Sequence, residues 1–254
     1  MRIALFPMPD TVPPLKGRRL PNPAISSLTG NLMGCGIYLA EQLPVLQKLT
    51  PVIKNTLPAV IPELIGISAM SFLLRTARRI VSFIKNLDST IKFVTGSCHG
   101  ELMHKEIEED EVPGPFDFIL RGDNGLSFGE PVNALENKTA YRDVMGLSFS
   151  QDGVFVHNQP GSLEDLTKAA LPERKNQIRQ GYASGVKLLD IVETPRGCTI
   201  PCSFWSMTHK YGRKFRVYAI EWLRKEISDG KKPGLKYLVT ADDAITQSGH
   251  NGIR

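Results

Sequence analysis

The sequence lacks any long uninterrupted apolar segment. Its most apolar region, residues 52–74, contains Lys54, Asn55, Glu63 and two prolines, and the hydrocarbon core of a bilayer disfavours such residues. The apolar run at the first residues is too short for a secretory signal and is typical of a first β-strand. We therefore expect no membrane span and a cytoplasmic protein.

Cysteine is scarce as well. The chain has four cysteines among 254 residues, at positions 35, 98, 198 and 202. Four thiols spread over a chain of this length do not indicate a disulfide framework. In a reducing compartment, the close pair at 198 and 202 favours a metal-binding or redox role.

Dense basic runs and nucleotide-binding glycine motifs are also missing. The net charge is only +5, and Lys and Arg are spread along the chain without interleaved aromatic residues, so we expect no nucleic-acid partner. No GxGxxG or GxxxxGK[ST] pattern follows a predicted strand. This absence argues against a flavodoxin-like domain for another nucleotide cofactor, which remains the lowest-ranked alternative.

The N-terminal half alternates short apolar runs with amphipathic segments. Strands are predicted at residues 2–8, 63–70, 90–96 and 116–120, and helices at residues 77–87, after the loop 97–100 as far as 109, and in a segment ending near 137. Five prolines between residues 9 and 23 predict an extended loop without a helix, and residues 36–57 have helical spacing cut by prolines. Because parallel strands need crossover helices, the pattern predicts an α/β fold with a flavodoxin-like (Rossmann-like) doubly wound parallel sheet.

The C-terminal part has a different texture. Residues 146–158 alternate around Asp152-Gly153 and predict a hairpin. A linker follows, and then a strand at 186–192, a helix at 218–229 with Ile220, Leu223 and Ile227 on one stripe, and a strand at 235–239. We interpret the chain as a domain at 1–140, a hairpin and linker at 141–185, and the first βα units of an incomplete TIM-like barrel at 186–254.

Two groups of motifs stand at the ends of these predicted strands. The sharper group is Arg196-Gly197-Cys198-x-x-x-Cys202-x-Phe204, followed by Tyr211-Gly212-Arg213-Lys214-Phe215-Arg216 and by Asp242-Asp243. The other group comprises Phe6-Pro7, Gly66-Ile67-Ser68, Thr95-Gly96-Ser97-Cys98-His99 and Arg121-Gly122-Asp123. On these residues the chain resembles the cobalamin-binding radical SAM proteins, in which a cobalamin-binding domain precedes a radical SAM barrel.

The resemblance implies cofactors and the residues that would contact them. Cobalamin and S-adenosylmethionine would be bound by residues from both groups, namely Pro7, Ser68, Ala69, Gly96, Ser97, His99, Arg121, Gly122, Phe204, Asp242 and Asp243. Cys198 and Cys202 would be ligands of a [4Fe–4S] cluster, which the family holds with a CxxxCxxC motif. The implied activity is methyl transfer or related radical chemistry.

The chain also departs from the family pattern. Family members typically have Gly-Gly-x-His and Arg-Gly-Glu-Gly-Glu, whereas this chain differs at Ser97, Asp123 and Asn124. His99 is expected to order its loop, with cobalamin bound without a protein ligand to cobalt.

Trp205 stands where the third cluster cysteine would be, and an indole has no lone pair for iron. The barrel pattern stops after about two strands, which predicts a truncated domain whose exposed strand edge a partner chain could cover. We therefore expect impaired radical chemistry, with a non-catalytic cobalamin-binding module or degenerate paralogue as the alternative.

Overall fold

The structure is a computed structural model of the chain. It describes residues 1–7, 18–19, 23–32, 36–39, 53–54, 57–58, 60–96, 100, 102–105, 116–123, 125, 128–137, 139–152, 154–172, 183–184, 187–230, 235–242 and 244.

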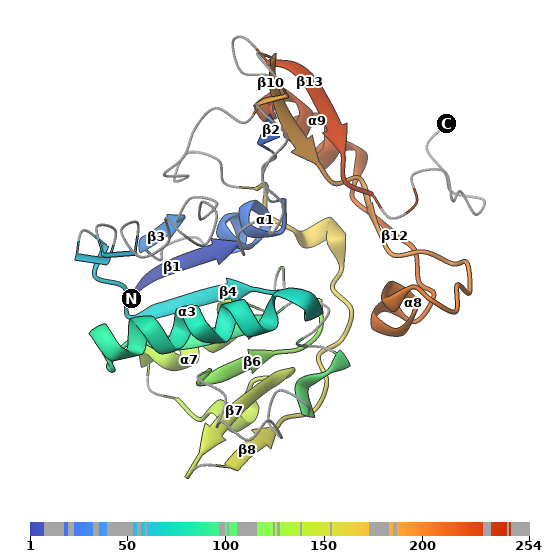
Figure 1. The fold of residues 1–254 in the computed structure, drawn as a ribbon. Helices are drawn as coiled ribbons and strands as arrows, with labels where there is room; N and C mark the ends of the chain where they lie inside the picture. Colours follow the sequence, from blue (N-terminus) through green and yellow to red (C-terminus); the bar gives the residue numbers. More distant parts are fainter. Residues whose placement is uncertain are drawn as a thin grey trace.

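The larger of its sheets has seven strands in the described part of the chain, in the order β3-β1-β4-β5-β6-β7-β8 (Figure 1). Their bounds are β1 Arg2–Pro7, β3 Gly36–Leu39, β4 Leu64–Ser68, β5 Lys92–Gly96, β6 Phe118–Leu120, β7 Leu147–Gln151 and β8 Val154–His157. The first five strands of this order are parallel, and β7 and β8 are antiparallel. Numbered along the chain, the parallel strands lie in the order 2-1-3-4-5.

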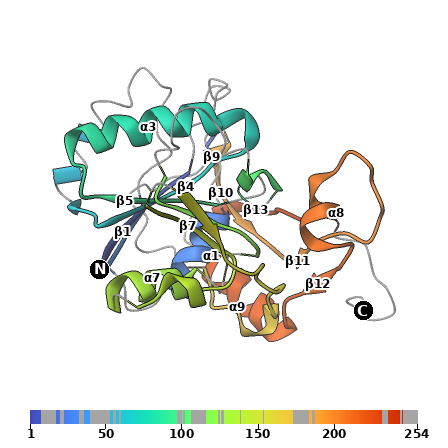
Figure 2. The same ribbon diagram turned by 90° about the horizontal axis from the view of Figure 1, so that it is seen from below.

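Helices cover both faces of this sheet. The helix α3 (Leu74–Leu87) lies on one face, and α1 (Pro23–Asn31) and α7 (Gly129–Asn137) lie on the other (Figure 2). Because side chains alternate along a strand, Ala4 and Phe6 of β1 belong to the core beneath α3, whereas Ile3 and Leu5 belong to the core beneath α1 and α7. The short apolar runs thus form strands that are buried on both faces, as parallel sheets require.

Most of the predicted elements are confirmed, and one expectation is wrong. Residues 36–39, expected to begin a helical segment, form the strand β3 and pair in parallel with β1. The helix α1 begins at Pro23, the last residue of the proline-rich stretch; of the other residues of that stretch, only 18 and 19 belong to the described part of the chain. Proline suits the first position of a helix, where its missing N–H would have no intrahelical partner.

The predicted hairpin forms and joins the large sheet. Strand β7 is hydrogen-bonded to β6, so the hairpin extends the sheet. Asp152 at the turn has φ 55°, a left-handed conformation that Asp tolerates better than most residues. The proposed domain boundaries remain a prediction.

A second sheet of four described strands has the order β13-β10-β9-β2. Its strands are β2 Arg18–Arg19, β9 Ala183–Ser184, β10 Lys187–Val192 and β13 Leu235–Thr240. Strands β10 and β13 are parallel, and the helix α9 (Ile220–Gly230) connects them. This confirms the predicted strand, helix and strand.

The inward face of α9 differs from the predicted stripe. Leu223 is buried as expected, but Ile220 is exposed, and Glu226 is only 1% exposed. The helix therefore turns an acidic side chain inward, next to Trp222 and Tyr218 along a small internal space.

The segment between β10 and α9 contains a clasp of two short strands. Strand β11 (Pro195–Arg196) pairs antiparallel with β12 (Arg216–Val217), and the helix α8 (Ser206–Tyr211) lies in the loop between them. We call residues 197–215 the cysteine loop. The three-residue 3₁₀ helices are η2 Ser71–Leu73, η3 Tyr141–Asp143 and η4 Leu166–Lys168.

None of the helices in the described part of the chain is both long and apolar enough to cross a bilayer.

Candidate cofactor site

A cavity of about 260 Å³ opens at the carboxyl ends of the parallel strands. Leu5 of β1, Gly66 and Ser68 of β4, and Gly96 of β5 line it, and Phe128 completes the apolar wall. In open parallel sheets, ligands bind at this edge because the strand order reverses there. The cavity lies at that position, between β1 and β4.

Gly66 keeps part of this space open. A Cβ atom at Gly66 would lie 2.6 Å from Cδ2 of Leu5 and 3.6 Å from Cγ1 of Val94. Any side chain here would displace Leu5 and narrow the cavity.

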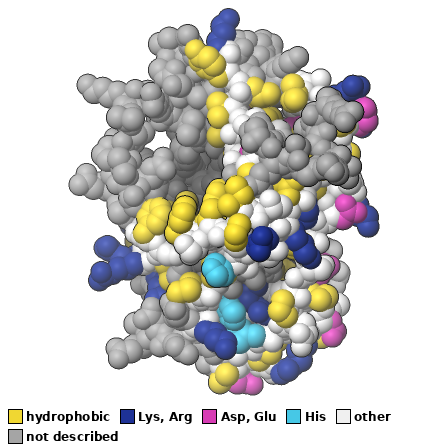
Figure 3. Space-filling model, turned by 90° about the vertical axis from the view of Figure 1, so that its right-hand side faces the viewer, with side chains coloured by type: hydrophobic (Ala, Val, Ile, Leu, Met, Phe, Trp, Pro, Cys, Tyr) yellow, Lys and Arg dark blue, Asp and Glu magenta, His cyan; other side chains and the backbone are white. Residues whose placement is uncertain are grey.

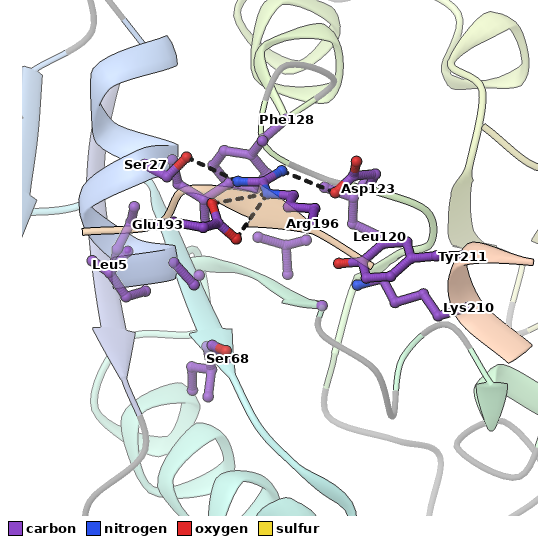
Figure 4. Close-up of a pocket in the computed structure, with 18 residues that line it drawn as sticks. Leu5, Ser27, Ser68, Leu120, Asp123, Phe128, Glu193, Arg196, Lys210 and Tyr211 are labelled. Carbon is purple, nitrogen blue, oxygen red and sulfur yellow. Dashed lines mark hydrogen bonds and ion pairs between the residues drawn. The ribbon is translucent and has the colours of Figure 1, made fainter. Parts of the chain in front are cut away.

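The opposite wall comes from the second part of the chain. Glu193, Arg196, Lys210 and Tyr211 all line the same cavity, together with Asp123, which follows β6 (Figure 4). Arg196 immediately precedes the cysteine loop, and Lys210 and Tyr211 lie on its helix α8. The cavity is therefore shared between the large sheet and the cysteine loop.

A network of buried charges fixes this junction, and Arg196 is its centre. Its Nη1 donates to Oδ1 of Asp123 at 2.9 Å, and its Nε donates to both carboxylate oxygens of Glu193 at 2.9 and 3.0 Å. Nη1 also lies 3.6 Å from Oε2 of Glu164, and Nη2 lies 3.3 Å from Oγ of Ser27 on α1. One guanidinium thus ties the base of the cysteine loop to three other segments.

Asp123 also forms an ion pair with a second arginine, Arg216. The carboxylate is 3% exposed and also accepts a hydrogen bond from Nη1 of Arg216 on β12. The same nitrogen donates to the backbone carbonyl of Glu164 at 2.9 Å. Both strands of the clasp are therefore tied to the residue that follows β6.

Burial and charge shift several pKa values in this network. Burial raises the pKa of Glu193, although Arg196 and a 2.6 Å hydrogen bond from Tyr218 oppose the shift. Burial also raises the pKa of Tyr218, and the facing charge of Glu193 adds to it. At Arg196 burial acts to lower the pKa, but Glu193, Tyr218 and Asp123 outweigh it, and the pKa is raised. Arg196 therefore stays a cation, and burial favours the neutral form of Glu193.

The start of the cysteine loop requires glycine. Gly197 has φ 86°, and a Cβ atom there would lie 2.1 Å from the carbonyl oxygen of Lys214. Both the left-handed backbone and the close approach exclude other residues. The Arg-Gly-Cys motif thus needs glycine at 197 because the two sides of the cysteine loop, at residues 197 and 214, are in contact there.

The cysteine pair does not form a complete cluster site. Cys198 is 5% exposed, and Cys202 is half-buried; neither forms a disulfide bond. Trp205 occupies the N-cap position of α8. Within the described residues, no group of three His, Cys, Asp or Glu side chains could hold a metal ion. The residues present do not match the three thiolates that a [4Fe–4S] cluster of this type requires.

The other predicted site residues lie in several places. Ser68 and Gly96 line the cavity, and Pro7 is the register partner of Ser68. Ala69 is fully buried beside them. Gly122 has φ 103° in the turn before Asp123. Ser97, His99 and Asp243 lie outside the described residues.

Arg121, Phe204 and Asp242 have positions that the motifs alone did not reveal. The buried side chain of Arg121 donates to the backbone carbonyl of Asn158. Phe204 is 88% exposed and does not line the cavity. Asp242 accepts hydrogen bonds from the backbone N–H and the hydroxyl of Thr194, both at 2.7 Å, and so fixes the chain before β11.

The residues that sequence reasoning missed are the charges of the junction. Asp123, Arg196 and Arg216 stood within quoted motifs, and Lys210 and Tyr211 stood in or next to one, but no role was assigned to them. A usable signal was the position of Asp123 and Arg196 shortly after predicted strands and of Arg216 shortly before the predicted helix at 218–229.

No protein-family model matches the chain. An uncharacterized methyltransferase of Pyrococcus horikoshii is 26% identical over 188 residues, which cover 73% of this chain and 40% of that protein. The hopanoid C-3 methylase of Methylococcus capsulatus is 28% identical over 145 residues, which cover 56% of this chain and 27% of the methylase.

Solved structures give a likeness over almost the whole chain. The radical S-adenosylmethionine methyltransferase TsrM of Kitasatospora setae, with tryptophan and a SAM analogue bound, has a TM-score of 0.73 at 15% identity over 97% of this chain and 48% of TsrM. A second TsrM structure contains cobalamin and a [4Fe–4S] cluster. The cobalamin-dependent radical enzyme OxsB, with aqua-cobalamin and S-adenosylmethionine bound, has a TM-score of 0.77 at 20% identity over 99% of this chain and 35% of OxsB.

These likenesses establish the fold, and they confirm the resemblance to cobalamin-dependent radical SAM methyltransferases inferred from the motifs. The chain spans less than half the length of each of these relatives.

Proposed function

We propose that this chain binds cobalamin at the carboxyl edge of its large sheet and holds the cofactor against the cysteine loop, as part of a protein similar to cobalamin-dependent radical SAM methyltransferases. The observation that carries the proposal is the cavity between β1 and β4, which small residues keep open and which the cysteine loop closes from the other side. The spatial order 2-1-3-4-5 is that of flavodoxin-like sheets, which bind cofactors at this position.

The cavity fits part of cobalamin. Its volume of about 260 Å³ is below the roughly 300–1,000 Å³ of sites that enclose a drug-sized ligand. Its mainly apolar wall suits the flat base at the end of the nucleotide tail, and the larger corrin ring would remain outside. When bound, cobalamin supplies group-transfer chemistry at its cobalt.

Exposed apolar side chains in two segments that contribute other residues to the cavity support this arrangement. Met70 and Phe72 follow β4 and are exposed, as is Phe204 in the cysteine loop. Figure 3, which views the side toward which β1 and β4 run in Figure 1, shows a row of hydrophobic side chains across it. Such side chains would gain burial beneath a large macrocycle.

The second sheet is consistent with our proposal that residues 186–254 form the first units of a radical SAM barrel. Strand β10, helix α9 and strand β13 form one parallel crossover, the repeating unit of such barrels. Strand β13 pairs only with β10 among the described strands, and Tyr237, Leu238 and Val239 are exposed along it. We propose that a partner chain covers this edge, because an open apolar edge favours association. A cytoplasmic location belongs to the same proposal, since Cys198 and Cys202 form no disulfide bond.

The cysteine loop supports impaired cluster assembly. The loop supplies two cysteines, and Trp205 occupies the N-cap position of α8 where the third ligand would lie. The second candidate function, a non-catalytic cobalamin-binding module, rests on this departure from the cluster motif alone. The two candidates share the cofactor and differ in whether iron is held.

Cobalamin binding is tested by titrating the purified chain with hydroxocobalamin and following the absorbance spectrum and co-elution in gel filtration. We expect the cofactor to co-elute with the wild type and to be lost from Gly66→Val, in which the added side chain enters the cavity. Gly129→Val is the matched control, because a Cβ atom there meets no atom within 4 Å. A wild type that neither changes the spectrum nor retains the cofactor would overturn the proposal.

Iron content separates the two candidates. After anaerobic reconstitution with iron and sulfide, we expect the wild type to hold far fewer than about four irons per chain and Trp205→Cys to gain iron. Phe204→Cys adds a thiol at the neighbouring position, outside the CxxxCxxC spacing, and should gain none. About four irons in the wild type would refute impairment and the binding-module candidate.

A further inference from the structure

The helix α8 carries two polar side chains to a cavity that is otherwise mainly apolar. Lys210 and Tyr211 line this cavity, and the ends of both side chains point into it (Figure 4). They come from the cysteine loop, whereas the apolar walls come from the large sheet. We propose that Lys210 is an anion-binding residue of this cavity, which takes the single negative charge of a ligand whose apolar end lies between β4 and Phe128.

The charge distribution leaves Lys210 available for this role. Asp123 accepts hydrogen bonds from Arg196 and Arg216, Glu193 accepts from Arg196 and Tyr218, and the carboxylate of Glu164 pairs with Arg196. Each carboxylate at the junction is therefore already paired. Within the described residues, Lys210 has no carboxylate partner, and its Nζ lies over the ring of Tyr211 at 5.3 Å from the centroid.

The ring of Tyr211 is also in contact with a second cation, Arg216. The guanidinium carbon of Arg216 lies 5.1 Å from the centroid of the Tyr211 ring, and Arg216 is itself fixed by Asp123. Cations over an aromatic face are attracted by its negative potential. Tyr211 therefore restricts where the ammonium group of Lys210 can lie.

The ligand chemistry follows from these two walls. A flat apolar or heteroaromatic group fits beside Gly66 and Gly96, and a singly charged phosphodiester or carboxylate fits at Lys210. The inference rests on the proposed function, under which the anion is the phosphodiester of the cobalamin nucleotide tail. A cation held against an apolar cavity attracts such a group strongly, because little water screens the pair.

The test compares two corrinoids on the full chain. Cobalamin carries the phosphodiester and its base, whereas cobinamide lacks both. We expect Lys210→Met to weaken hydroxocobalamin binding by about tenfold, which corresponds to one charge-assisted hydrogen bond, and to leave the affinity for diaquacobinamide unchanged. Lys210→Arg should retain most of the cobalamin affinity because it keeps the positive charge. Lys214→Met, an exposed lysine of the same loop, is the matched control.

The outcomes separate this inference from the proposed function. If the wild type binds neither corrinoid, the proposed function fails, and the inference fails with it. If the wild type binds cobalamin but Lys210→Met binds it equally well, or loses both corrinoids equally, only the anion-binding role is overturned. Weakening of S-adenosylmethionine binding in Lys210→Met, with cobalamin binding intact, would assign the cation to that carboxylate and overturn the phosphodiester.

Discussion

Replacing Asp123 by Asn should separate the clasp from the large sheet. The amide keeps the shape of the side chain and removes the charge shared by Arg196 and Arg216, whose side chains are 11% and 15% exposed. Removing one partner of a buried ion pair costs about 3–5 kcal/mol. Arg196 keeps Glu193 and Glu164, but Arg216 has no other carboxylate partner among the described residues. We therefore expect a loss of about 3 kcal/mol.

The loss is measurable by thermal unfolding followed by circular dichroism. For a chain of this size, 1 kcal/mol corresponds to about 2–4 °C in Tm, so Asp123→Asn should melt about 6–12 °C lower. Asp143→Asn removes an exposed carboxylate and should change Tm by less than about 2 °C. In combination with Arg216→Met, the two losses should not add, because both variants break the same pair. An Asp123→Asn variant with the Tm of the wild type, or strict additivity, would refute the account of the network.

Two further predictions concern the base of the cysteine loop. Gly197→Ala should lower the free energy of unfolding, measured with denaturant, by at least about 2 kcal/mol, because the added Cβ would clash with the carbonyl of Lys214. Gly212 also has a positive φ, but a Cβ there meets no atom within 4 Å, so Gly212→Ala should cost only about 1 kcal/mol. Equal losses in the two variants would show that the clash does not contribute. Glu193 has a raised pKa in the folded chain, so folding favours its protonated form. The stability of the wild type relative to Glu193→Gln should therefore fall as the pH rises from the pKa of an unfolded glutamate, about 4.3, through the pKa in the folded chain. Paired unfolding curves between pH 4 and pH 7 measure the difference, and a difference that grows with pH would contradict the burial argument.

Much of the large sheet could be predicted from sequence because its signals are local. The stripe of Ala77, Ile80, Val81 and Ile84 has helical spacing, and all four side chains are buried in the structure. The Asp-Gly turn likewise identified the hairpin before its pairing partner was known. Strand β3 was mistaken for helix because its stability comes from parallel pairing with β1, which leaves no periodic signal in so short a segment.

The candidate site was only partly predictable for a related reason. Strand ends pointed to Ser68 and Gly96, because the edge at which parallel strands end follows from the order of elements. The partners of Asp123 lie 73 and 93 positions away, and no local pattern encodes such contacts. Asp242 was assigned to a cofactor from its motif, while its hydrogen bonds to Thr194 depend on how β13 lies beside β10.

The clasp of β11 and β12 closes the cysteine loop at its two ends, independently of the residues in the loop interior. Closing a flexible loop costs conformational entropy that depends mainly on joining its two ends, and here the ends are joined by strand pairing and by the contacts of Arg196 and Arg216. Side chains in the loop interior, such as Phe204, contribute little to that closure. The interior, Trp205 included, can therefore be changed while the scaffold stays folded, and the loop can be engineered as an exchangeable segment.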